Sequence, residues 1–181
     1  SLDPVRFLHS DAYRPLPTLV RAARELFQSG NVTRIHRAAA ATDPAVELLT
    51  RLVHDAAKQR RRKLVLLAGV PGAGKTLVGL RLVHSNFLDD LSVDRGNGKP
   101  TAPAVFLSGN GPLVAVLQHE LQSAGGGGKT FVRGVKEYVT AHTTGRSRRV
   151  PAQHVLVYDE AQRAYDAAMV KEKHKDNPGA A

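Results

Sequence analysis

The sequence contains no cysteine and no tryptophan, and only one methionine, in 181 residues. Without cysteine the chain can form neither a disulfide framework nor a cysteine-ligated zinc site, and this composition fits a reducing compartment. No apolar run approaches the roughly 20 residues that a membrane-spanning helix requires. The N-terminal residues also lack the charged start and apolar centre of a signal peptide. These absences predict a cytoplasmic protein with no membrane partner.

Aromatic and acidic residues are both scarce. The chain has four tyrosines, five phenylalanines and no tryptophan. Its 26 Lys and Arg residues outnumber its 16 Asp and Glu residues, which gives a net charge of +10. The positive charge is densest in residues 58–63 (KQRRRK) and at Arg146, Arg148 and Arg149. Such clusters bind polyanions such as DNA or RNA, although a solvated face that keeps a protein soluble has the same composition. The few aromatic rings argue against recognition of RNA bases by stacking.

Hydrophobic periodicity divides the chain into two parts. Residues 1–62 are expected to form a helical N-terminal segment, in which a second helix begins at Asp43 with Pro44 at its first position. In residues 63–181 buried-strand and helical patterns alternate. The strand patterns lie at 63–69, 104–109, 131–135 and 154–158, and the main helical patterns begin near Lys75 and at 112. This alternation predicts a three-layer α/β domain with a parallel sheet.

The stretch GVPGAGKT matches the phosphate-binding pattern G-x-x-x-x-G-K-[ST] in full. It lies between an expected strand and an expected helix, so main-chain N–H groups and a helix N-terminus would surround an anion. We expect Lys75 to reach the β- and γ-phosphates of a nucleotide and Thr76 to ligate Mg²⁺. The residues predicted to bind the nucleotide are Gly69, Val70, Pro71, Gly72, Ala73, Gly74, Lys75 and Thr76, together with Asp159.

A second Gly-Lys-Thr sequence ends the stretch SAGGGGKT, residues 123–130. Here Ser123 stands where the phosphate-binding pattern requires glycine, and the stretch follows a helical pattern instead of a strand. Ordering four consecutive glycines also costs much backbone entropy. Residues 124–128 are therefore interpreted as a surface loop and not as a second phosphate site.

Two adjacent carboxylates, Asp159 and Glu160, follow the apolar run HVLVY. Ligands bind at the carboxyl ends of parallel strands, so we expect Asp159 to hold Mg²⁺ and Glu160 to align a water on the γ-phosphate. Two acids at a helix N-terminus are also stabilising without any catalytic role. The chain has no [NT]-K-x-D motif for guanine, which leaves ATP as the expected nucleotide. Gln59 could bind adenine or simply end a solvated helix.

Three stretches in this order, GVPGAGKTLVGL, AVFLSGNGPLVAVL and HVLVYDEAQRAYD, resemble one family over residues 12 to about 175. It is a bacterial domain-of-unknown-function family of Schlafen-group-3-like DNA/RNA helicase-domain ATPases, which look like superfamily-1 helicases. The resemblance implies a RecA-like P-loop NTPase core, with residues 69–76 as motif I and 159–162 as motif II.

The resemblance also implies roles for single residues. Lys75, Glu160 and Gln162 would be catalytic, with Gln162 coupling the nucleotide site to a nucleic-acid cleft. Ser108, Gly109 and Asn110 stand at the position of motif Ia and would contact the backbone of a DNA or RNA strand.

The sequence departs from this family after motif II. In ATPases with an adjacent glutamate, a later strand lies between the loop-bearing strand and the Asp-Glu strand. Only 21 residues follow Glu160, and they contain no buried-strand pattern. The motifs of a sensor, an arginine finger and a second motor domain are absent as well. We therefore expect an incomplete front portion of a larger domain, with a second motor domain or an effector domain of the same protein as a partner.

Three functions are compatible with these motifs. The first is the ATP-binding and hydrolysing module of a helicase-like motor on DNA or RNA. The second is an ATP-dependent switch that controls a partner or an attached effector domain without unwinding strands. The third, a small-molecule kinase, is disfavoured because Glu160 beside Asp159 suits water as the phosphoryl acceptor.

Overall fold

The computed structural model describes residues 19–29, 36–84, 86–94, 100–123, 128–143 and 150–161. The helices are α2 (Leu19–Ser29), α3 (His36–Lys58), α4 (Lys75–His84), the 3-10 helix η2 (Asn86–Leu91), α5 (Gly111–Ser123), α6 (Gly128–Phe131) and α7 (Val135–Thr143). The strands are β1 (Val93–Asp94), β2 (Pro100–Thr101), β3 (Ala104–Ser108), β4 (Val132–Gly134) and β5 (Val155–Asp159). None of the helices in these ranges is long and apolar enough to cross a bilayer.

Strand β3 is the centre of a three-stranded parallel sheet with the order β4-β3-β5. All five of its residues are buried, as expected for an apolar strand that is covered on both faces. The register pairs Ser108 with Gly134 in β4 and with Asp159 in β5. The carboxyl ends of the three strands therefore meet at one edge of the sheet.

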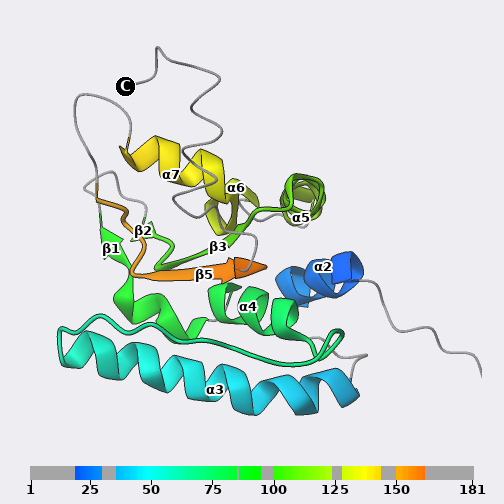
Figure 1. Cartoon of the computed structure of the whole chain (residues 1–181), viewed down its shortest axis with the longest axis horizontal. Coiled ribbons are helices and arrows are strands. Elements are labelled where there is room, and N and C mark those ends of the chain that lie inside the picture. The colour runs from blue at the N-terminus through cyan, green and yellow to red at the C-terminus, as the bar shows by residue number, and fades with distance from the viewer. Residues whose placement is uncertain are drawn as a thin grey trace, which may run out of the picture.

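Helices cover both faces of this sheet, α4 on one side and α7 on the other (Figure 1). Successive strand residues point to opposite faces, so Phe106 joins a core cluster with Leu80 of α4, whereas Val105 and Leu107 pack with Tyr138 of α7. Helix α3 lies outside α4 (Figure 1). These layers bear out the predicted α/β architecture and are compatible with a fragment of a RecA-like domain.

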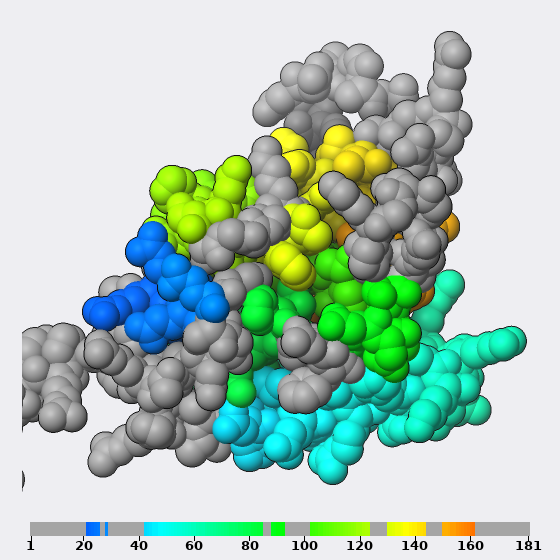
Figure 2. All heavy atoms as spheres, turned by 180° about the vertical axis from the view of Figure 1, so that it is seen from behind, coloured from blue at the N-terminus to red at the C-terminus, as the bar shows by residue number. Residues whose placement is uncertain are grey.

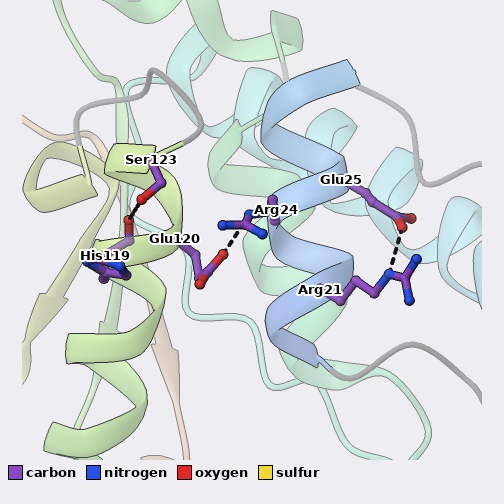
Figure 3. Close-up of polar contacts among 6 residues, drawn as sticks. All are labelled: Arg21, Arg24, Glu25, His119, Glu120 and Ser123. Carbon is purple, nitrogen blue, oxygen red and sulfur yellow. Dashed lines mark hydrogen bonds and ion pairs between the residues drawn. The ribbon is translucent and has the colours of Figure 1, made fainter.

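Helix α2 joins the N-terminal segment to the rest of the molecule. It packs against α4 and α5, and its Ala22 and Ala23 are buried in the larger core cluster. Arg24 forms an ion pair with Glu120 of α5 at 2.7 Å, which Figure 3 shows between the two helices. Helices α2 and α3 therefore pack on the helices that cover the sheet.

The prediction of a buried strand at 63–69 is wrong. Residues 61–70 form no strand, and the side chains of Leu64 and Leu66 are 87% and 83% exposed. An apolar run forms a strand only where a neighbour supplies hydrogen-bond partners. Within the described ranges, β5 pairs with β3 alone and no strand lies along its other edge, so the 63–69 segment has no partner there.

The predicted start of the second helix at Asp43 is also wrong. Helix α3 begins at His36 and continues through Pro44, although proline removes one helical hydrogen bond. The Asp43 carboxylate pairs with Arg81 of α4 and does not cap a helix. A tertiary ion pair has therefore replaced the local capping role that the sequence indicated. Residues 162–181 lie outside the described residues.

Gly79 lets α4 approach the sheet closely. A Cβ at this position would lie 2.8 Å from Cγ1 of Val157 and 3.1 Å from Cε2 of Phe106. Glycine to alanine normally stabilises a helix by about 1 kcal/mol, but here overpacking should reverse the sign. We expect Gly79→Ala to lower the free energy of unfolding by about 1–3 kcal/mol in urea denaturation.

Gly111→Ala is the matched control for this change. Gly111 begins α5, and an added Cβ would meet nothing within 4 Å, so this variant should be neutral or slightly stabilised. Equal stability of the two variants would show that α4 does not depend on this close approach.

Candidate nucleotide site

Residues 69–74, which belong to the stretch that matches the phosphate-binding pattern and are named the phosphate loop for that match, form a largely exposed loop that leads directly into α4. Gly72 and Gly74 have φ angles of +79° and +85°, a region that glycine enters without the steric cost of a Cβ. The Ala73 N–H donates to the Val70 carbonyl at 3.1 Å, and the Val78 N–H donates to the Gly74 carbonyl at 2.9 Å. A tight turn thus ends at the first helical hydrogen bond, and the loop stands at the positive end of α4.

The Lys75 side chain folds back over this loop. Its Nζ donates to the carbonyls of Gly69 at 2.7 Å and Val70 at 3.0 Å. The ammonium group therefore lies against the carbonyl groups at the start of the loop. Its contact with the phosphates of a nucleotide stays a prediction.

Thr76 and Asp159, which are 83 positions apart in the sequence, are in direct contact. The Thr76 hydroxyl donates to Asp159 Oδ1 at 3.1 Å and lies 3.3 Å from Oδ2. Close packing of α4 on β5 at Gly79 and Val157 makes this approach possible. Burial raises the pKa of Asp159, and the hydrogen bond from Thr76 opposes this shift.

Thr76 and Asp159 provide a hydroxyl and a carboxylate oxygen side by side. Oxygen ligands of this kind are the ones that Mg²⁺ prefers. Within the described ranges no three His, Cys, Asp or Glu residues gather into a metal cluster. Two protein oxygens completed by phosphate and water are the usual way in which Mg²⁺ is held at nucleotide sites.

Glu160 follows Asp159 in an uncommon backbone conformation, with φ at +56°. For a non-glycine residue this conformation costs about 1–2 kcal/mol, and residues of this kind cluster at functional sites. The Glu160 N–H forms a hydrogen bond to the Asp159 carboxylate, which lowers the pKa of Asp159. This hydrogen bond ties the Asp159 carboxylate to the backbone of Glu160 at the end of β5.

The residues at the motif Ia position lie beside Asp159, because Ser108 is its register partner. Ser108 is buried, and its Oγ accepts the Asn110 N–H at 3.2 Å. Asn110 Oδ1 in turn accepts the Leu113 N–H at 3.3 Å and caps α5. Both side chains build the turn itself, and Gly109 presents the exposed backbone there.

The remaining predicted positions divide into two groups. Gln162, Arg146, Arg148 and Arg149 lie outside the described residues. Gln59 is exposed at the C-terminal end of α3, and the chain runs back along α3 before it reaches the phosphate loop (Figure 1). Gln59 and the loop are therefore at opposite ends of α3, and this position does not support a contact with adenine.

The structure adds residues that the sequence patterns did not indicate. Thr42 of α3 lies against Gly74 of the phosphate loop, and it accepts a hydrogen bond from Arg81 of α4. Thr42 lies 27 positions before the loop begins and belongs to no motif, so only its packing against the loop identifies it.

Comparison with known families is consistent with these features. The sequence model of the family described as "Schlafen group 3, DNA/RNA helicase domain" matches residues 62–179, well over half of the chain. No curated protein and no solved structure gives a significant match. The matched range contains the phosphate loop, strand β3 and the Asp159–Glu160 pair, so the chain belongs to the Schlafen group 3, DNA/RNA helicase domain family.

Proposed function

We propose that the chain is the ATP-binding and hydrolysing module of a helicase-like motor that acts on DNA or RNA. The observation that carries this proposal is the contact between Thr76 at the start of α4 and Asp159 at the end of β5. It joins a phosphate-binding loop to a carboxylate from a distant part of the chain, as a nucleotide site with Mg²⁺ requires.

Each residue of the site has a distinct task in this proposal. The loop amides and the positive end of α4 bind the phosphates, and Lys75 moves from the loop carbonyls to the β- and γ-phosphates. Thr76 and Asp159 hold Mg²⁺, which neutralises charge that develops on the phosphates. Glu160 aligns the attacking water and accepts a proton from it. Gln162 is proposed to relay the state of this site to the nucleic acid.

The exposed apolar segment favours a larger P-loop core of the RecA type. Leu64 and Leu66 face solvent, and the edge of β5 away from β3 is unpaired in the described part of the chain. Unpaired strand edges and exposed apolar runs are normally covered in proteins with parallel sheets.

The nucleic-acid half of the proposal is supported by the family description and by positive charge. Residues 58–63 are all exposed, and Figure 2 shows the end of α3 and the residues after it at the border of the molecule. Five of these six side chains are cationic, so they can contact phosphates and release counterions. We propose that they bind the backbone of the strand at a distance from the ATP site.

Binding of ATP with and without Mg²⁺ tests this function. The 181-residue chain should bind a fluorescent ATP analogue, and removal of Mg²⁺ by EDTA should weaken binding at least about tenfold, because Asp159 and the phosphates then repel each other. Asp159→Asn should bind about equally with and without Mg²⁺. No binding of the analogue by the wild-type chain would refute the proposal.

The same preparation tests the motor. ATP turnover should rise when single-stranded DNA or RNA is added, and binding of the strand should weaken as salt increases. If the chain binds ATP but its ATP turnover is not stimulated and it shows no salt-dependent binding of a strand, the proposed nucleotide site stands and the proposed nucleic-acid partner is refuted.

A further inference from the structure

Of the three glycines in the phosphate loop, only Gly74 lies close to a side chain from outside the loop. A Cβ on Gly69 would meet only Ala73 and Lys75 of the loop itself, and a Cβ on Gly72 would meet nothing within 4 Å. A Cβ on Gly74, by contrast, would lie 3.2 Å from Cγ2 of Thr42. The methyl group of Thr42 therefore occupies the space beside Gly74, the residue that immediately precedes Lys75, into which a side chain at that position would project.

Thr42 is itself held firmly in place. It is only 1% exposed, and Arg81 Nη1 donates to its hydroxyl at 2.7 Å. The same guanidinium nitrogen pairs with the carboxylate of Asp43, the next residue of α3. Hydroxyl and methyl thus have different partners: the hydroxyl bonds to α4, and the methyl touches the loop.

These contacts form a closed triangle of α3, the loop and α4. Arg81 lies six positions after Lys75 on α4, so its bond to Thr42 ties α3 to the helix that begins at the loop. The loop is otherwise rich in glycine and exposed, and ordering it costs backbone entropy. Packing of Thr42 beside Gly74 restricts the conformations of the free loop, so less conformational entropy is lost when a phosphate binds.

We propose that Thr42 is a positioning residue of the phosphate loop, fixed by Arg81 and Asp43, and that α3 thereby sets the affinity for the phosphates of ATP. This inference rests on the proposed function for its ligand. Helix α3 ends before residue 62, where the family match begins. The nucleotide site of this chain would accordingly include a part that lies outside the family domain.

Two substitutions at Thr42 separate the roles of its methyl and hydroxyl groups. Thr42→Ser keeps the hydroxyl for Arg81 but removes the methyl that touches Gly74. We expect about fivefold weaker binding of the fluorescent ATP analogue in Mg²⁺ and about tenfold faster amide hydrogen exchange in residues 71–75 without nucleotide. Thr42→Val keeps a methyl at this place, so loop exchange and ATP affinity should stay close to wild type even if the lost hydrogen bond lowers overall stability.

Thr50→Ser is the matched control, because it removes the same methyl from the same helix two turns further from the loop. It should leave loop exchange and ATP affinity unchanged. Equal loop exchange in Thr42→Ser and Thr50→Ser would overturn the proposal, as would a loss of loop protection in Thr42→Val equal to that in Thr42→Ser. Hydrogen exchange needs no nucleotide, so a failure of ATP binding by the wild-type chain would refute the proposed function and still leave the loop support testable.

Discussion

Glu160→Gln is expected to lower ATP turnover by about 100-fold or more while ATP still binds. A carboxylate that accepts a proton from the attacking water contributes roughly 10²–10⁴ to the rate, and glutamine keeps the shape but cannot accept the proton. Binding should persist because Lys75, Thr76 and Asp159 are unchanged. Single-turnover hydrolysis and analogue binding, measured on the same variant, separate the two effects.

Glu137→Gln provides the control for this prediction, since Glu137 is an exposed glutamate in the first turn of α7. It should behave as the wild type in both measurements. Turnover by Glu160→Gln at the control rate would show that another group activates the water. The variant also discriminates between the two functions: a motor stalls with ATP bound, whereas a switch stays locked on its partner.

Lys75→Ala is expected to weaken binding of ATP by about 50-fold or more. The Lys75 ammonium group lies against the carbonyl groups of Gly69 and Val70 in the loop. A charge-assisted contact between this group and two phosphates would be among the stronger polar interactions. The free chain should lose little stability, because the two hydrogen bonds of Nζ are solvent-exposed. Calorimetric titration with ATP and Mg²⁺, together with thermal unfolding without nucleotide, measures both quantities.

Lys136→Ala removes an exposed lysine from α7 and should leave ATP affinity unchanged. If Lys75→Ala binds ATP as tightly as this control, the loop does not hold the phosphates in the way proposed. A large drop in the thermal midpoint of Lys75→Ala alone would instead show that Lys75 maintains the loop.

Local patterns predicted much of the fold correctly. The buried run at 104–109 became β3 (Ala104–Ser108), and the helical pattern from Lys75 became α4 (Lys75–His84). Both elements have partners within the described residues, so their composition and environment agree. The apolar run at 63–69 is similar in composition, but it has no neighbouring strand in the part of the chain that the structure describes, and it is exposed. The composition of a segment indicates whether it can be buried, but a strand forms only where a second segment of the chain supplies its hydrogen-bond partners.

The sequence by itself determined which residues are candidates for the site, because Gly72, Gly74, Lys75 and the Asp159–Glu160 pair follow from spacing and residue type. Only the tertiary structure decided which of these groups meet: α4 packs on β5 and brings Thr76 to Asp159, and α3 brings Thr42 to Gly74. Local patterns depend on backbone preferences within a few residues, whereas these contacts depend on side chains from distant segments that fill the same space.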